Sequence, residues 1–138
     1  MPTPLQEAQQ WLREFETACR GRDFDTGRRM FAEDAVAFGT WAMAVHGLAN
    51  IEREQWRNVW PRIRNFTFET EPVVRASGDT AWIAAAWSSE ATGADGKPFV
   101  RPGRATFILA PRNGRLQCVH SHVSLQPTQS ESAHGKLG

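Results

Sequence analysis

Residues 99–126 read FVRPGRATFILAPRNGRLQCVHSHVSLQ, and this stretch decides the fold. It contains two strand-like runs separated by the sequence RNG, which is typical of a tight hairpin turn. Two earlier runs, residues 66–76 and 80–91, have the same two-residue period and are bounded by glycine-containing turns. The sequence therefore predicts a meander of four long antiparallel strands.

The N-terminal half has the period of helices instead. Apolar side chains recur every three or four residues over residues 5–20 and again over residues 23–33. A third helix is predicted over residues 51–63, with Asn50 as its N-cap, and a short strand over residues 35–38. Helices followed by a strand meander predict an α+β fold, in which about three N-terminal helices pack on the concave face of a curved antiparallel sheet.

Length and charge restrict the possible functions. The chain has 138 residues, which suits a single domain, predicted over residues 1–127 and followed by a flexible tail at residues 128–138. Its 16 basic and 15 acidic side chains give a net charge of +1, so we expect no nucleic-acid or membrane partner. Without an apolar run of membrane-spanning length or a signal peptide, and with two cysteines expected to be free thiols, a cytoplasmic protein is predicted.

The most informative polar pattern is HSHVS at residues 120–124. Alternation places His120, His122 and Ser124 on one face of the last strand, and we predict that this face forms the polar end of a pocket. Histidine is suited to acid–base or ligand-binding work near neutral pH. The other open interpretation is that both imidazoles form hydrogen bonds with neighbouring segments and orient the strand.

A metal site is a further interpretation of the two histidines. Imidazoles two residues apart project from the same side of a strand, but a metal site also needs a third ligand. His46 and Glu90 are the only candidates for that ligand, and nothing in the sequence brings them near. We therefore predict no metal and no cofactor.

Aromatic residues predict the remainder of the pocket. The chain has six tryptophans and eight phenylalanines but no tyrosine, a composition typical of a lined cavity or an interface. The predicted ligand-binding side chains are Val36, Phe38, Trp41, Trp56, Trp60, Trp87, Arg104 and Phe107. Arg104 either points inward or is an edge residue. Trp82 and Trp87 point to opposite faces of their strand, so one indole lies on an outer surface that a second subunit would cover.

The order of several motifs resembles a known superfamily. In chain order these motifs are RDFDTGRRMFAEDAVAF, VHG, GRATFIL, RNGRLQCVHSH and HSHVS. Over residues 5–127 the chain resembles the SnoaL-like branch of the nuclear transport factor 2-like superfamily, whose cone-shaped fold is shared with ketosteroid isomerase. It is similar in pattern to the association domain of calcium/calmodulin-dependent protein kinase II. The resemblance implies a conical pocket between sheet and helices, and a homodimer formed through the outer face of the sheet.

Together these observations predict a protein that binds a small, mainly hydrophobic organic molecule and, if it is an enzyme, converts that molecule without a cofactor. In that case His122, with His120 beside it, acts as general acid or base, and Ser124 orients the substrate for an isomerisation, dehydration or cyclisation. The alternative is a non-catalytic dimerisation or oligomerisation module with a vestigial pocket. A third interpretation follows from a resemblance to the iota-class carbonic anhydrases, whose pocket histidine and serine match His122 and Ser124.

Overall fold

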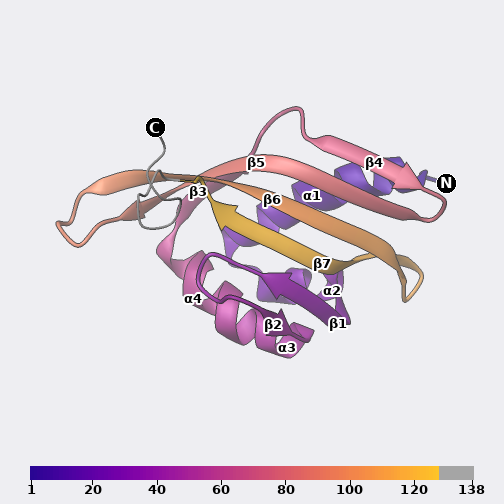
Figure 1. The fold of residues 1–138 in the computed structure, drawn as a ribbon, viewed down its shortest axis with the longest axis horizontal. Helices are drawn as coiled ribbons and strands as arrows, with labels where there is room; N and C mark the ends of the chain where they lie inside the picture. The colour runs from indigo at the N-terminus through magenta and orange to yellow at the C-terminus, as the bar shows by residue number, and fades with distance from the viewer. Residues whose placement is uncertain (128–138) are drawn as a thin grey trace, which may run out of the picture.

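A computed structural model describes residues 1–127 of the chain (Figure 1). The helical elements are α1 (Pro4–Gly21), α2 (Phe24–Met30), α3 (Leu48–Ile51), the π-helical turn η1 (Glu52–Trp56), α4 (Arg57–Val59) and the 3₁₀-helical turn η2 (Trp60–Arg62). The strands are β1 (Phe31–Phe38), β2 (Val45–His46), β3 (Arg64–Phe68), β4 (Val73–Ser77), β5 (Thr80–Thr92), β6 (Pro98–Arg112) and β7 (Arg115–Leu125). The predicted tail at residues 128–138 lies outside the described residues.

The strands form one curved sheet in the order β2-β1-β7-β6-β5-β3, with β4 paired to β5. Neighbouring strands run antiparallel, except that β1 and β7 run parallel. In Figure 1, α1 and α2 lie behind the sheet, and α3 and α4 lie below β1 and β2. This arrangement confirms the predicted α+β class with helices on one face of a curved sheet. The parallel pairing, which joins the N-terminal strand to the last strand, was not predicted.

The first helix is the element that the sequence predicts best. The Thr3 hydroxyl accepts a hydrogen bond from the backbone N–H of Gln6, and the Gln6 side chain accepts one from the backbone N–H of Thr3. No helix within residues 1–127 is long and apolar enough to cross a membrane. Instead, α1 packs its apolar stripe against the inner face of the sheet. The buried residues of this stripe are Ala8, Trp11, Leu12, Phe15, Ala18 and Cys19.

Two predicted elements have wrong boundaries because part of each pairs with a distant strand. The helix predicted over residues 23–33 ends at Met30, because Phe31 already has extended backbone and pairs with Cys118 of β7. The strand predicted over residues 66–76 is divided into β3 and β4, which pair with different parts of β5. Pro72, which has no N–H for a sheet ladder, lies in the break. In both places pairing with a distant strand overrides the local pattern.

The third helical segment starts earlier than predicted. Gly47 occupies its N-cap position with a φ of +89°, a conformation that favours glycine, so Asn50 is not the cap. The Asn50 side chain instead donates a hydrogen bond to the carbonyl of His46 over 2.9 Å. Further along, Trp56 and Trp60 are four residues apart and share one face, and their rings stack with centroids 4.9 Å apart.

Alternation along the long central strands separates two faces of the sheet. On β5, Trp87 is 4% exposed on the inner face and Trp82 is 43% exposed on the outer face, as predicted. On β6, Phe107 is buried and its neighbour Ile108 is exposed. No helix of the described chain lies in front of the sheet in Figure 1. The inner face therefore holds the core and the candidate site, while the outer face is open to solvent in the single chain.

Candidate functional site

A cavity lies between α1, the segment from η1 to η2, and the inner face of the sheet. Its wall is mainly aromatic, formed by Phe15, Phe31, Trp56, Trp60, Trp87 and Phe107. The cavity volume is about 60 Å³. An engineered cavity of about 150 Å³ accepts a benzene molecule, so this one has room for a smaller group. Aromatic side chains thus fill most of the interior of the cone.

Phe15 of α1 stands at the centre of the aromatic wall. Its ring makes edge contacts with Trp60 and Phe107, with centroids 5.8 and 5.5 Å apart. The stacked pair of Trp56 and Trp60 closes the side facing α2. A Cβ atom on Gly27 of α2 would lie 2.9 Å from the Trp56 ring, so α2 approaches this closely only because residue 27 has no side chain.

Trp87 depends on a second close approach. Its indole lies across β6 at Gly103, where an added Cβ would be 2.2 Å from Trp87 Cζ2 and 2.4 Å from the Ser124 carbonyl oxygen. Only glycine leaves room for the ring at this position. The Trp87 Nε1–H is buried and has no hydrogen-bond partner among the described residues. One donor in the wall of the cavity is therefore unsatisfied by the protein.

Arg101 of β6 provides the polar end of the cavity. It lies directly opposite Ser89 of β5, and its Nη1 donates a hydrogen bond to the Ser89 hydroxyl over 3.1 Å. Its Nη2 donates to the Thr40 hydroxyl over 3.4 Å, and its guanidinium lies 5.6 Å from the centroid of the Trp87 ring. The loop after β1 and the middle of the sheet are thus joined through one cation.

The charge of Arg101 is not balanced by a neighbouring carboxylate. Within residues 1–127 its guanidinium takes part in no ion pair. Burial lowers the pKa of Arg101, and the only charge that opposes this is on the Cys19 sulfur in its ionised form. At neutral pH the cavity therefore has a half-buried cation at one end.

Cys19 also lines the cavity, but its chemistry is restricted. Burial raises the pKa of the Cys19 thiol to about 12, so the sulfur remains protonated at neutral pH and is a poor nucleophile. Burial raises the pKa of Cys118 as well. No histidine, aspartate or glutamate of residues 1–127 lines the cavity. The described wall thus contains no group suited to proton exchange near neutral pH.

The predicted polar residues of β7, His120, His122 and Ser124, lie on the outer face of the sheet and not in the cavity. Ser121 and Val123 line the cavity, whereas His122 and Ser124 lie in a shallow depression on the outer face of the sheet. His122 is exposed, and Ser124 accepts a hydrogen bond from Arg104 Nε over 3.2 Å. The prediction that the HSHVS histidines form the polar end of the cavity is therefore wrong about their position.

A β-bulge explains this reversal. Leu109 of β6 pairs with Cys118, but the preceding residue, Ile108, pairs with His120, so Val119 is an additional residue in β7. Before the bulge the even-numbered residues of β7 point inward, as the buried Cys118 does. After the bulge the odd-numbered residues point inward, as the buried Ser121 does. One extra residue moves every following side chain to the other face.

The two imidazoles have different environments on the outer face. His120 Nδ1 is hydrogen-bonded to the carbonyl oxygen of Val36, 2.8 Å away on the parallel neighbour β1. Both histidine rings meet the ring of Phe38 edge-on, with centroids 5.0 and 5.2 Å away. His120 thus matches the interpretation in which an imidazole orients the strand, while His122 faces solvent.

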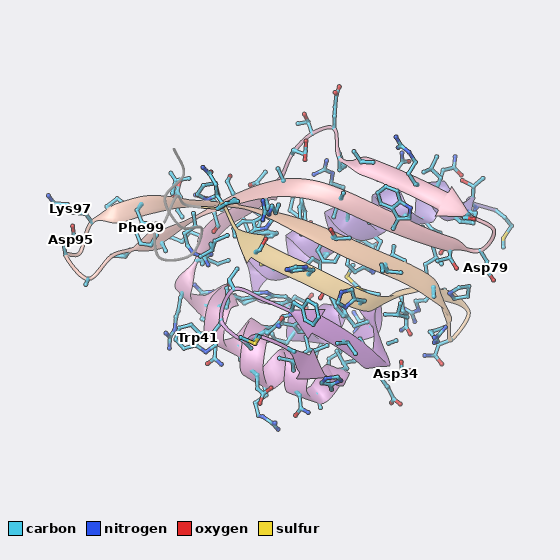
Figure 2. The ribbon with its side chains drawn as sticks, in the orientation of Figure 1. Asp34, Trp41, Asp79, Asp95, Lys97 and Phe99 are labelled. Atoms are coloured by element: carbon cyan, nitrogen blue, oxygen red, sulfur yellow. The ribbon has the colours of Figure 1, made fainter. Side chains whose placement is uncertain are left out.

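The other predicted ligand-binding residues divide into two groups. Trp56, Trp60, Trp87 and Phe107 line the cavity. Val36, Phe38 and Arg104 do not line it and lie on the outer face, as their pairing with the His120–Ser124 side of β7 requires. Trp41 is 62% exposed and packs under the Arg62 guanidinium, and Figure 2 shows it near α4 at the edge of the molecule.

Sequence reasoning missed the main polar groups of the site, Arg101, Thr40 and Ser121. Arg101 was detectable, because it is six residues before Phe107 on the same strand and therefore points to the same face. Ser121 was hidden by the bulge. Thr40 lies in a glycine-flanked loop without a recognisable period, so its position depends on tertiary packing.

The candidate metal ligands do not come together. His46 lies on β2 beyond β1, two strands away from His120. Glu90 lies on β5 and accepts a hydrogen bond from Asn65 over 3.3 Å. Residues 1–127 contain no group of three histidine, cysteine, aspartate or glutamate side chains able to hold a metal ion.

The SnoaL-like domain family matches residues 8–129 of the chain. The chain belongs to this family. No curated protein matches the sequence. The match covers the SnoaL-like domain from the first helix to the end of the last strand, so the cavity and both sheet faces described above are features of that domain.

Solved structures confirm the fold of this SnoaL-like domain. A ketosteroid isomerase-like protein from Erwinia carotovora atroseptica is 19% identical and superposes with a TM-score of 0.79, covering 93% of this chain and 100% of that one. A CaMKII hub from S. rosetta is 21% identical with a TM-score of 0.76, covering 91% and 99%. An NTF2-like superfamily protein from Salmonella enterica serovar Typhimurium is 17% identical with a TM-score of 0.77, covering 92% and 94%. At these identities the likeness shows the shared fold alone.

Proposed function

We propose that this SnoaL-like domain binds a small, mainly apolar organic molecule in the cavity on the inner face of the sheet. The observation that carries the proposal is the aromatic wall that ends in polar donors at Arg101 and Thr40. Small-molecule sites are concave, mostly apolar, and contain a few placed polar groups. The volume of about 60 Å³ favours a short aliphatic group over an aromatic ring.

The proposal is for binding without conversion of the ligand. A general acid or base must reach the reacting atoms directly or through one water molecule. His122, predicted for this role, is on the outer face, and the thiol of Cys19 is protonated at neutral pH. Ser124 shares the outer face with His122, which also removes support for the carbonic anhydrase interpretation.

The test uses 1-propanol, which is smaller than benzene, as a short aliphatic probe. Tryptophan fluorescence and thermal unfolding are followed during titration of the wild-type protein and of Val123→Phe, which places a ring at the cavity wall. We expect the probe to raise the unfolding temperature of the wild type and to have at most a small effect on Val123→Phe. Ser124→Phe, on the adjacent outward position, is the matched control and should bind as the wild type does. Equal binding by both variants would place the probe elsewhere and contradict the proposal.

We also propose that the outer face of the sheet mediates self-association. Trp82 pairs with Ile108, which pairs with His120, so these side chains form one row across β5, β6 and β7. Trp82 and Ile108 are 43% and 37% exposed, and Val73 and Phe38 beside this row are similarly exposed. Contiguous apolar surface of this kind is typical of an interface. A homodimer would cover it.

Sedimentation analysis tests this second proposal. Trp82→Glu places a charge in this row and should convert a dimer to a monomer at micromolar concentration. Trp41→Glu changes an indole that is exposed elsewhere on the molecule, so it should leave the dimer intact. A wild-type protein that sediments as a monomer at high concentration would reject the proposal.

A further inference from the structure

We propose that the loop of residues 39–44, which joins β1 to β2, is a gate over the mouth of the cavity, and that the hydrogen bond between Thr40 and Arg101 is the latch that holds it closed. This inference rests on the proposed function, because it assigns a route of entry to the molecule that the cavity binds. It depends on three features: the position of the loop on the rim, its side-chain tie to the sheet, and the exposure of the side chains that would move.

The mouth of the cavity is marked by the wall residues that are only partly buried. In the described chain these are Gly39, Thr40, Val59, Arg101 and Val123, whereas the rest of the wall is buried. Val59, Arg101 and Val123 belong to α4, β6 and β7, whose backbones are held by helical or sheet hydrogen bonds. Gly39 and Thr40 belong to a loop without helix or strand. The loop is therefore the part of the rim that moves at the lowest cost.

The latch crosses the mouth from the sheet to the loop. Arg101 Nη2 donates a hydrogen bond to the Thr40 hydroxyl over 3.4 Å, a length at which such a bond is weak. No other side-chain hydrogen bond within residues 1–127 involves the loop. Arg101 itself is supported by the Ser89 hydroxyl, 3.1 Å away on a residue that is 1% exposed. The latch thus joins a fixed donor to a movable acceptor.

The side chains of the loop bury little surface that opening would expose. Met43 is 90% exposed and Trp41 is 62% exposed. Figure 2 shows Trp41 at the edge of the molecule, where its ring lies 5.5 Å from the Arg62 guanidinium, and a cation–π contact at an exposed site is weak. Ala42 packs partly against the core, but with a single methyl group. Opening the gate therefore costs mainly the latch and one small apolar contact.

Both ends of the loop are fixed, so its motion is confined to the segment over the mouth. Gly39 lies against Gln55, whose side chain would be 2.6 Å from a Cβ atom at residue 39. At the other end, Val45 is 2% exposed and pairs with Ala37 of β1. The Gly39 N–H donates a hydrogen bond to the carbonyl of Ala42 over 3.1 Å, which closes a turn that can move as a unit. A segment between two fixed ends of this kind behaves as a hinged element.

The two cysteines of the chain report on the gate without a ligand. Cys19 lines the cavity, whereas Cys118 is buried away from it. Burial raises the pKa of the Cys19 thiol to about 12, and the charge of Arg101 opposes that rise, so this thiol lies within electrostatic reach of the rim. A small thiol reagent that enters through an open gate should therefore modify Cys19 before Cys118.

Labelling with methyl methanethiosulfonate, followed by peptide mass spectrometry, tests the gate. Each rate is divided by the rate of the same thiol in the urea-unfolded protein, which removes differences in intrinsic reactivity. We expect Cys19 to be labelled about tenfold or more faster than Cys118. Thr40→Val replaces the acceptor hydroxyl with a methyl group of similar size, so it should raise the Cys19 rate about fivefold and leave the Cys118 rate unchanged.

Two further variants serve as controls for the latch. Thr40→Ser keeps the acceptor hydroxyl and should be labelled at the rates of the wild type. Ser124→Ala removes the acceptor of the Arg104 hydrogen bond on the outer face, so it deletes a comparable bond away from the mouth. This variant should also leave both rates unchanged.

The outcomes separate this inference from the proposed function. Equal normalised rates for Cys19 and Cys118 in the wild type would mean that both thiols react only through global unfolding, which would overturn the gate. A Cys19 rate that Thr40→Val does not change would remove the latch, and so would a rise of both rates together, because it would show a general loss of stability. No ligand takes part in the labelling. A failure of 1-propanol to bind would therefore reject the proposed function and leave the result for the gate intact.

Discussion

The two faces of the central sheet have similar side chains but opposite environments. Each face of β5 carries a tryptophan, and each face of β7 carries serine residues. On the inner face, Trp87 is covered by the helices and its N–H is unsatisfied. On the outer face, Trp82 is 43% exposed beside exposed Ile108. The residue types alone therefore do not reveal which face holds a ligand.

The two faces also differ in how well a charged side chain is solvated. On the outer face, Arg104 has solvent and the Ser124 hydroxyl as partners, so its charge is solvated. On the inner face, Arg101 is half buried and supported by two neutral hydroxyls. A polar group that the fold leaves without a complete set of partners is more informative about a ligand than an exposed one. This difference favours Arg101 over the histidines as the polar group that meets a ligand.

The largest effect should come from removing one tryptophan from each face. Trp87→Ala is expected to reduce the free energy of unfolding by about 3–5 kcal/mol, because a buried ring is lost and a cavity remains. Trp82→Ala, on the same strand, should cost about 1 kcal/mol or less in the monomer, since its ring is already partly hydrated. Urea unfolding at low protein concentration measures both. Similar losses in the two variants would show that the outer face is as well packed as the inner one.

A smaller effect should follow from crowding the inner face at Gly103. An added Cβ there would lie 2.2 Å from Trp87 Cζ2, so Gly103→Ala must move the indole or the strand. We expect a loss of about 1–3 kcal/mol in the free energy of unfolding. In the background of Trp87→Phe, whose ring is smaller, the same substitution should cost less. A double-mutant cycle with no coupling would mean that Trp87 is not the group displaced.

Most of the fold could be predicted from local pattern. The stripe of α1, the hairpin turn before β7 and the long strands β5 and β6 are visible as helical and two-residue periods. The errors occur where a distant strand decides the conformation. Phe31 joins β1 rather than α2 because it pairs with Cys118, and the parallel contact of β1 with β7 has no local signal.

The site was predicted only in its apolar half. Trp56, Trp60, Trp87 and Phe107 are large and follow a clear period, so their inward position could be inferred. The polar half depended on the direction of β7, and the bulge at Val119 reverses that direction. A bulge of this type arises from pairing between strands, and nothing in the sequence CVHSH marks it. Sequence pattern therefore grouped the histidines correctly with each other but on the wrong face.

Alkaline pH should lower the free energy of unfolding, because two thiols are buried on the inner side of the sheet. Burial raises the pKa of Cys19 to about 12 and also raises that of Cys118, whereas an unfolded thiol has a pKa of about 8.5. The folded state therefore binds these protons more tightly, so its stability is complete below about pH 8.5 and falls as pH rises toward the folded pKa. Each thiol should contribute a loss of about 1.4 kcal/mol per pH unit above about pH 9.

Urea unfolding at several pH values measures this slope. The chain has no tyrosine, so the main competing group in this pH range is absent. Cys19→Val removes one of the two thiols and should reduce the slope by about half. A slope that is unchanged in this variant would indicate that the Cys19 thiol is already hydrated in the folded protein.

The smallest effect should come from His122, the residue that the sequence pattern predicted to be catalytic. His122 is exposed on the outer face, so His122→Ala should change the free energy of unfolding by less than about 0.5 kcal/mol and probe affinity by less than about twofold. Ser121→Phe, one position away but pointing into the cavity, should abolish binding of the same probe. Titration of 1-propanol into both variants compares adjacent residues on opposite faces. A large loss of affinity in His122→Ala would mean that the outer face communicates with the cavity, and the separation between the two faces would then fail.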